Sequence, residues 1–147
     1  MINFCVSLTT IPSRIKEIEL TINSLITQTK KPQKIFLNIP YKYERFPDQL
    51  ISTEYFEKFA NIKILEVVRC NDFGPGTKLL GSINKLEKYS HVVLVDDDHI
   101  YQKDMFEIFF NEALKNPHSA YSFCVYDIED LKVGQGADGF MINIKYL

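Results

Sequence analysis

The chain has 147 residues, of which 46% are hydrophobic and 24% are charged, and its formal net charge is -2. This size fits one globular domain, 1–147, and such a domain buries roughly two thirds of its unfolded surface without disulfides or a structural metal. The near-neutral charge excludes a general attraction to nucleic acid or to anionic membranes.

The cysteines and the N-terminal residues indicate the compartment. Cys5, Cys70 and Cys124 are an odd number at long spacings, which fits neither a disulfide framework nor a CxxC metal site. The first ten residues have no basic leader, and no apolar run is long enough to span a bilayer. We therefore expect a soluble protein of a reducing compartment, located in the cytoplasm, or in the host cytoplasm if the source is a virus.

Short runs rich in β-branched residues alternate with stretches in which apolar residues recur every three or four positions. The first run predicts a strand at 4–8. The apolar spacing after Arg14 predicts a helix that Ser13 caps and that ends before Pro32. The remaining predicted elements are, in chain order, a strand at 35–39, a short helix at 55–60, a strand at 62–68, a helix at 77–88, a strand at 91–95, a helix at 105–114, and strands at 120–126 and 140–144 that flank a glycine-rich turn.

This alternation predicts an α/β fold with a Rossmann-like, mostly parallel sheet and helices on both faces. If the strand order is 3-2-1-4, the order reverses between the first and fourth strands. Ligands of such sheets bind at that point, beyond the carboxyl ends of the strands. The segments 9–14 and 96–98 are therefore expected to face each other across one crevice.

Three consecutive aspartates follow the fourth predicted strand, and their mutual repulsion needs a cation or hydrogen-bond donors to offset it. In an extended segment, Asp96 and Asp98 point the same way and Asp97 points the opposite way. Two convergent carboxylates suit Mn²⁺ or Mg²⁺, because such ions are commonly held by one or two carboxylates, water and the oxygens of a substrate diphosphate. The alternative is a solvated acidic turn that caps the next helix.

The segment 72–78 opens a helix and places the Lys78 ammonium beside the first amides, an arrangement that suits a phosphate. It is not a P-loop, because the GxxxxGK[ST] spacing is absent. The alternative is an ordinary turn with Thr77 as the N-cap and an exposed Lys78. Arg14, at the start of the first predicted helix, is a second candidate phosphate contact.

The glycine-rich segment 134–139 contains Asp138, a candidate general base that would take a proton from an acceptor hydroxyl. The same glycines equally suit the turn of a hairpin. His99 is a candidate metal ligand or orienting donor. Among the aromatic residues, we expect Tyr101, Phe106, Phe109 and Phe110 in the core. Tyr41, Tyr43 and Phe46 are expected in a surface loop, and contact with a sugar ring is the alternative.

Three motifs occur in a fixed order: residues 6–14, the run Asp72-x-Gly74-Pro75-x-Thr77-Lys78, and the strand that ends in Asp96-Asp97-Asp98-x-x-Tyr101. Together they resemble the nucleotide-sugar-binding half of a GT-A glycosyltransferase. The resemblance is nearest to small, family-2-like domains of bacterial and large-virus sugar transferases, and it covers 7–139.

The resemblance implies a metal-dependent glycosyltransferase of the hexosyltransferase class, with a UDP- or dTDP-sugar donor whose diphosphate binds Mn²⁺ or Mg²⁺. It implies that Asp98 is the direct metal ligand and that Asp96 faces the ribose or the metal. The nucleotide-binding residues that it implies are Thr9, Thr10, Pro12, Arg14, Asp72, Lys78, Asp96 and Asp97. An acceptor hydroxyl, on a glycan or another molecule, would be deprotonated by a carboxylate such as Asp138.

Members of this family generally continue past the equivalent of Gly139 with acceptor-binding helices, whereas this sequence ends at Leu147. Few residues of this sequence therefore correspond to the acceptor-binding half of the family. Three explanations stay open: an unusually small enzyme, one part of a larger enzyme, or a site that a further domain or oligomer partner completes.

Three rival functions compete with this interpretation. A haloacid-dehalogenase-type phosphatase also has Asp-x-Asp after a strand, but normally after the first strand and with Thr or Val where this chain has Ile100. A receiver-like phosphoacceptor domain divides its acids between two strands, whereas here all three follow one strand. A non-catalytic sugar-nucleotide-binding module fits the same motifs.

Overall fold

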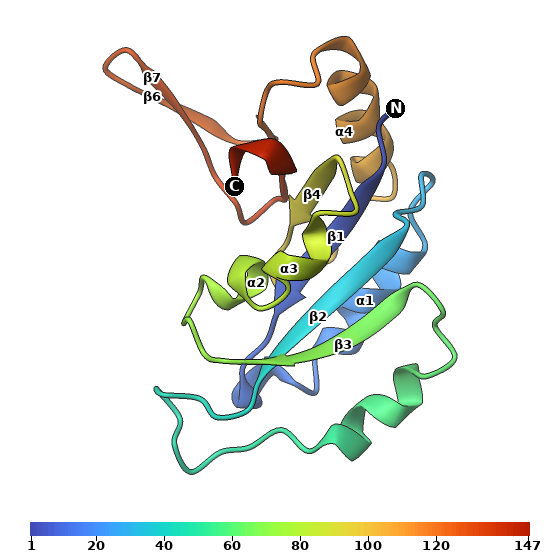
Figure 1. Cartoon of the computed structure of the whole chain (residues 1–147), viewed down its shortest axis with the longest axis vertical. Coiled ribbons are helices and arrows are strands. Elements are labelled where there is room, and N and C mark those ends of the chain that lie inside the picture. Colours follow the sequence, from blue (N-terminus) through green and yellow to red (C-terminus); the bar gives the residue numbers. More distant parts are fainter.

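The structure is a computed structural model, which describes the backbone of residues 1–147 and every side chain except that of Thr53. Its main sheet has six strands in the order β3-β2-β1-β4-β8-β5, and β6 and β7 form a separate two-stranded sheet (Figure 1). The strands are β1 (Phe4–Thr9), β2 (Lys34–Pro40), β3 (Leu65–Cys70), β4 (His91–Leu94), β5 (Tyr121–Ser122), β6 (Val125–Ile128), β7 (Leu131–Gly134) and β8 (Phe140–Asn143).

Helices occupy both faces of the main sheet (Figure 1). The α-helices are α1 (Ile18–Ile26), α2 (Thr77–Leu80), α3 (Ile83–Leu86) and α4 (Met105–Lys115), and the 3-10 helices are η1 (Pro12–Arg14), η2 (Thr53–Phe59) and η3 (Ile144–Tyr146). None of the helices in the described chain is long and apolar enough to cross a membrane.

The predicted strand order 3-2-1-4 is confirmed. The strands β1, β2, β3 and β4 are parallel, and Val6 of β1 pairs with Ile35 of β2 on one side and Val93 of β4 on the other. Because helices or helical turns connect these strands, the chain makes the crossovers expected of an α/β fold. The strands β8 and β5 then extend the sheet in antiparallel pairs.

The side chains of β1 divide between two hydrophobic clusters because successive residues of a strand point to opposite faces. Val6 and Leu8 belong to the larger cluster, which packs against α1 and α4. Cys5 belongs to the smaller cluster, which packs against Leu86 of α3. The sheet is thus covered on both faces, as predicted.

Several predicted boundaries were wrong, and the first helix is the clearest case. The chain after β1 forms the 3-10 turn η1, and α1 begins only at Ile18, with Glu17 and not Ser13 at the N-cap position. The predicted strand at 62–68 begins instead at Leu65, because Leu65 N donates to Ile62 O and closes a turn there.

The predicted helix at 77–88 is divided into α2 and α3. The division lies at Gly81, where an added Cβ would lie 2.8 Å from the Asn38 Cβ and 2.7 Å from the Thr77 carbonyl oxygen. Glycine is therefore needed for α2 to approach β2 this closely. This close packing brings Lys78 of α2 next to the end of β1.

The C-terminal part also differs from the prediction. The strand expected at 120–126 is broken, so that β5 has two residues and β6 begins a hairpin with β7. The hairpin turns at Glu129, whose φ is +53°, whereas the glycine-rich segment 134–139 connects β7 to β8. Gly139 there has φ +94°, a conformation that favours glycine.

Candidate functional site

A pocket of about 250 Å³ lies beyond the carboxyl ends of β1, β2, β3 and β4. The residues that line it come from the ends of these strands and from two loops: Thr9, Thr10, Ile11, Arg14, Pro40, Tyr43, Arg45, Phe46, Asp72, Gly74, Pro75, Thr77, Lys78, Asp96 and Asp97. The segments 9–14 and 96–98 therefore meet at one site, where an α/β sheet is expected to bind its ligand.

All residues predicted to bind nucleotide line this pocket except Pro12, which begins η1 beside it. The predicted metal ligand Asp98 is adjacent, since its carboxylate contacts the pocket residue Arg14. The structure thus gathers residues that are up to 88 positions apart in the sequence, from Thr9 to Asp97, around one volume.

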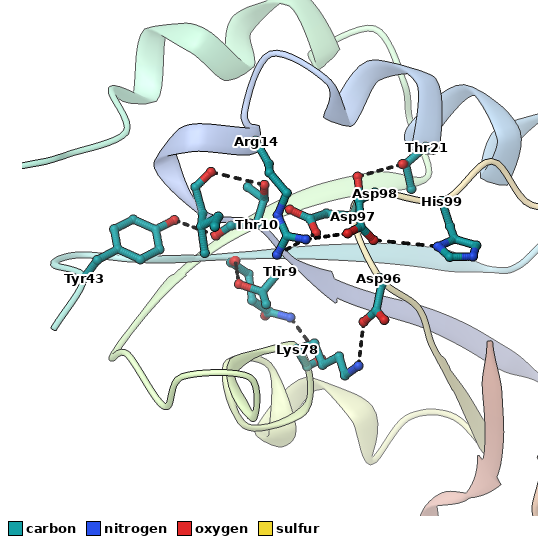
Figure 2. A network of polar contacts seen from close by, with 12 residues as sticks. Thr9, Thr10, Arg14, Thr21, Tyr43, Lys78, Asp96, Asp97, Asp98 and His99 are labelled. Carbon is teal, nitrogen blue, oxygen red and sulfur yellow. Dashed lines mark hydrogen bonds and ion pairs between the residues drawn. The ribbon is translucent and has the colours of Figure 1, made fainter. Parts of the chain in front are cut away.

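Each of the three aspartates contacts a cationic side chain (Figure 2). Lys78 Nζ lies 2.7 Å from Asp96 Oδ1. Arg14 contacts the other two, with Nη2 3.3 Å from Asp97 Oδ1 and Nη1 2.5 Å from Asp98 Oδ2. The segment is not extended, because β4 ends at Leu94 and the chain turns at 97–98. Asp96 and Asp98 are nevertheless the two more exposed carboxylates, and Asp97 between them is buried.

Asp97 is the most buried of the three, with 4% of its side chain exposed. Burial raises its pKa, although the Thr10 hydroxyl and the Arg14 guanidinium oppose the shift. Its backbone carbonyl accepts a hydrogen bond of 2.8 Å from the Thr21 hydroxyl, which anchors the turn to α1. Asp97 thus fixes this turn beneath the pocket, while Asp96 and Asp98 remain more accessible.

The loop that precedes α2 is organised by the Asp72 carboxylate. Asp72 Oδ1 accepts from Gly74 N and Oδ2 accepts from Glu44 N, both at 2.8 Å. The Thr77 hydroxyl accepts from Phe73 N at 2.8 Å. These bonds hold Lys78 in place toward Asp96, and they also connect the loop to the chain after β2.

One wall of the pocket includes Tyr43 and Phe46, for which the sequence favoured a surface loop over contact with a sugar ring. Tyr43, expected in a surface loop, is buried, and its hydroxyl donates to Thr10 O at 2.9 Å (Figure 2). Phe46 packs edge-on against it, with the ring centroids 6.4 Å apart. The grouping of aromatic residues directly after a strand end was the available signal, because aromatic side chains so placed can border a pocket.

The loop that carries this wall is tied down by an arginine. Arg69 of β3 donates to Pro40 O at 3.2 Å and to Ile51 O at 3.3 Å, so that it connects the two ends of the loop. Arg45 and Phe46 lie between these two points and line the pocket. The wall is therefore held by the sheet at both ends.

Asp138 does not line the pocket but lies near Asp98 through His99. His99 Nδ1 is 3.7 Å from Asp98 Oδ1, and His99 Nε2 is 3.5 Å from Asp138 Oδ1. The buried Tyr101 holds the segment of Asp138, since its hydroxyl accepts from Asp96 N at 2.8 Å and donates to Ala137 O at 3.0 Å. The predicted base thus lies on the metal-ligand side of the site, with 48% of its side chain exposed.

The donor set can be compared with what Mn²⁺ or Mg²⁺ needs. Within the described residues, no group of three or more His, Cys, Asp or Glu side chains is placed to hold a metal ion alone. Asp98 and Asp96 nevertheless offer accessible carboxylate oxygens beside two cations that suit a phosphate. Such a set fits an ion that takes one or two carboxylates and completes its shell with phosphate oxygens and water.

No model of a protein family matches the sequence, and no curated protein matches it significantly. Solved structures match its fold. TarS 1-349 from S. aureus in complex with UDP aligns with 91% of this chain at 20% identity and a TM-score of 0.62, and the chain covers 38% of TarS 1-349. The same segment in complex with UDP-GlcNAc aligns with a TM-score of 0.60 at 19% identity over 91% of this chain, which covers 37% of that one.

Two further proteins share the fold. The apo form of the glycosyltransferase GlyE from Streptococcus pneumoniae has a TM-score of 0.55 at 18% identity, over 99% of this chain and 35% of GlyE. A 4-diphosphocytidyl-2C-methyl-D-erythritol synthase from Anaerococcus prevotii has a TM-score of 0.61 at 14% identity, over 99% of this chain and 71% of the synthase. The fold is that of GT-A-type glycosyltransferases. The chain spans less than two fifths of the length of TarS 1-349 and of GlyE.

Proposed function

We propose that the pocket binds a nucleoside-diphosphate sugar, most simply a UDP-sugar, and that the protein is a glycosyltransferase of the hexosyltransferase class that transfers the sugar to an acceptor hydroxyl. The observation that carries this proposal is the meeting of Asp96, Asp97 and Asp98 with Arg14 and Lys78 at the edge of one pocket. The likeness in fold to TarS, whose structures contain UDP or UDP-GlcNAc, supports the choice of donor.

The charges suggest how the donor lies. The cationic groups of Arg14 and Lys78 are beside the aspartates and suit the diphosphate, because a guanidinium and an ammonium both donate strongly to phosphate oxygens. Tyr43 and Phe46 form the opposite, less polar wall. The nucleoside would therefore lie along Thr9 and Thr10 toward this wall, with Asp72 near its base or ribose.

Asp98, with Asp96, would hold a Mn²⁺ or Mg²⁺ ion together with the diphosphate. When bound, the ion would supply Lewis-acid stabilisation of the negative charge that grows on the departing nucleoside diphosphate. Lys78 would add positive charge on the same oxygens from the α2 side. Arg14 and Lys78 thus contribute electrostatic stabilisation from groups that the fold already holds in place.

Asp138 would accept the proton of the acceptor hydroxyl as that oxygen attacks the sugar carbon. His99 lies between Asp138 and Asp98, and the bond from Tyr101 to Ala137 O keeps the segment of Asp138 at this side of the pocket. A glycan or another hydroxyl acceptor would then approach from the side of β8.

A panel of nucleoside-diphosphate sugars, with and without Mn²⁺, tests the proposal when the release of nucleoside diphosphate is measured with and without a mixture of candidate acceptors. We expect metal-dependent release from a UDP-sugar that increases with acceptor. Absence of release from every donor, with or without metal, would contradict the proposed activity.

A non-catalytic sugar-nucleotide-binding module is the second candidate, because the pocket is lined by residues of 9–97 and Asp138 lies outside it. Metal-dependent binding of a UDP-sugar without turnover in any acceptor mixture would favour the module. Formation of a covalent aspartyl phosphate would instead indicate a phosphatase or a receiver-like domain.

A further inference from the structure

Arg14 contacts two aspartates, Asp97 and Asp98 (Figure 2). These two side chains differ greatly in exposure. Its Nη1 is 2.5 Å from Asp98 Oδ2, and Asp98 has 44% of its side chain exposed. Its Nη2 is 3.3 Å from Asp97 Oδ1, and Asp97 has 4% of its side chain exposed. One guanidinium therefore contacts a solvated carboxylate and a buried one at the same time.

The two contacts have different strengths for this reason. An exposed ion pair contributes little, because water screens it and solvates both partners when it opens. A buried carboxylate that loses its cationic partner is strongly destabilising, because the charge stays out of water without compensation. Arg14 is therefore free to leave Asp98 but is held at Asp97.

Asp98 is also the carboxylate that a divalent cation would need. A divalent cation and the Arg14 guanidinium repel each other if both bind the same carboxylate. In the free protein the guanidinium is already there. A metal ion that binds Asp98 alone is repelled by this guanidinium and brings no anion to which Arg14 can move. A metal ion with a diphosphate brings phosphate oxygens that accept from Arg14.

The buried part of the ion pair has unused hydrogen-bonding capacity. Among the described residues, Arg14 Nε and Asp97 Oδ2 are both buried without a hydrogen-bond partner. Such orphan atoms are unfavourable in the arrangement seen here. A turn of the guanidinium that brought Nε–H to Asp97 Oδ2 would satisfy both atoms and would free Nη1 from Asp98.

We propose that Arg14 makes metal binding conditional on the diphosphate: it occupies Asp98 in the free protein and pivots on Asp97 to a phosphate oxygen when metal and diphosphate enter together. This inference rests on the proposed function. It assigns Asp97, the middle aspartate, as the buried pivot, and Arg14 as both the competitor of the metal and a ligand of the diphosphate. No covalent step is involved.

The test compares the binding of Mn²⁺ alone, followed by electron paramagnetic resonance of free Mn²⁺, with the binding of UDP in the presence of Mn²⁺, followed by calorimetry. In Arg14→Ala we expect Mn²⁺ alone to bind about threefold tighter, because Asp98 is freed from a weak ion pair. We expect UDP with Mn²⁺ to bind about tenfold more weakly, because a charge-assisted hydrogen bond to phosphate is lost.

Arg14→Ala leaves Asp97 as a buried charge and can impair folding, so the double variant Arg14→Ala/Asp97→Asn repeats the test without that charge. In the double variant we again expect tighter binding of Mn²⁺ alone and weaker binding of UDP with Mn²⁺. Lys16→Ala is the matched control, because it removes one positive charge from an exposed position two residues away. Both affinities should stay within twofold of wild type in this control, a range that corresponds to small surface effects.

The inference is overturned if the folded variants bind Mn²⁺ alone no tighter than wild type does, including the case in which neither binds it. It is also overturned if they bind UDP with Mn²⁺ as wild type does. In both cases UDP binding by wild type would leave the proposed function standing. Failure of wild type itself to bind UDP with Mn²⁺ would overturn the proposed function.

Discussion

The parallel strands and the C-terminal strands of this protein differ in burial and in what they contribute to the site. The residues of β2 are buried from Ile35 to Pro40, whereas every residue of β6 is exposed, and the hairpin of β6 and β7 extends away from the rest of the chain (Figure 1). Every residue that lines the pocket comes from 9–97.

This difference indicates that the parallel strands and the C-terminal part contribute different groups to the site. The pocket is built on strand ends that two hydrophobic clusters fix from both faces, so it is preorganised for a ligand. The C-terminal part adds Asp138, which is held at the site by one hydrogen bond to its loop, from Tyr101 to Ala137 O, and by its proximity to His99. Donor binding and transfer should therefore be separable by mutation.

The largest expected effect concerns the C-terminal part. In Asp138→Asn we expect the transfer rate to fall by about 10²- to 10⁴-fold, the usual contribution of a general base. The affinity for UDP should be unchanged, because Asp138 lies outside the pocket lining. Initial rates and calorimetry measure the two effects.

Asp127→Asn is the control for Asp138→Asn, since Asp127 is an exposed acid of the hairpin that pairs with Lys132 at 2.8 Å. The transfer rate of Asp127→Asn should equal that of wild type. Normal turnover by Asp138→Asn would remove this residue as the base.

A matched pair of leucines measures the difference in burial directly. Leu37 of β2 is fully buried, and Leu37→Ala should lower the free energy of unfolding by about 2–5 kcal/mol, because it removes apolar contacts and leaves a cavity. Leu131 of β7 is 69% exposed, and Leu131→Ala should change it by no more than about 0.5 kcal/mol. Urea unfolding measures the free energy of unfolding of both variants. An equal decrease in the two would show that Leu131 is buried against another surface in solution.

Asp98→Asn tests the donor side of the comparison. We expect the affinity for UDP in Mn²⁺ to fall by about 10- to 100-fold, to the level that wild type shows with a chelator, because the proposed metal ligand is weakened. The fold should be unaffected, since the side chain is 44% exposed. Asp104→Asn, at an exposed position of the turn before α4, is the control. If metal affinity in Asp98→Asn stays normal, another residue is the ligand.

A smaller effect is expected at the junction between the two parts, where His91 at the start of β4 lies 3.2 Å through Nε2 from Pro117 O. Burial lowers the pKa of His91 from its ordinary value of 6.5. In the unfolded chain, His91 is therefore protonated as the pH falls through about 6.5, whereas in the folded protein it is protonated only at a lower pH. The free energy of unfolding should decrease as the pH falls through 6.5.

His91→Gln should lessen this decrease, whereas His118→Gln, at an exposed position, should preserve it. Urea unfolding at about pH 7.5 and pH 5.5, on either side of the ordinary histidine pKa, gives the comparison. An identical pH dependence in wild type and His91→Gln would show that other groups cause it.

The sequence was sufficient for the strand order and for the meeting of the segments 9–14 and 96–98 at one pocket. Apolar runs such as that of β1 alternate with helical spacing, and parallel crossovers bring the carboxyl ends of β1 and β4 to the same edge. The acidic run after β4 and the turn after β1 therefore had to meet. The same logic could not predict which cation contacts which aspartate, because a turn at 97–98 replaces the extended geometry.

The regions that were predicted wrongly depend on local conformation or on packing. The turn of the hairpin uses Glu129 with positive φ in place of the usual Gly or Asn, so no turn signal marked it. Tyr43 follows a strand end in a polar stretch. Its burial depends on residues distant in the sequence, since its hydroxyl donates to the carbonyl of Thr10, 33 positions earlier, and its ring joins the larger hydrophobic cluster. The break between α2 and α3 depends on the approach of Asn38 to Gly81.

The central claim is that this pocket binds a nucleoside diphosphate together with a divalent cation. Calorimetry of UDP with the wild-type protein, in Mn²⁺ and again with a chelator, tests it most directly. We expect micromolar to millimolar binding in Mn²⁺, the usual range for enzyme substrates, and binding about 10- to 100-fold weaker with the chelator. Absence of metal-dependent binding of UDP, and of every other nucleoside diphosphate, would contradict it.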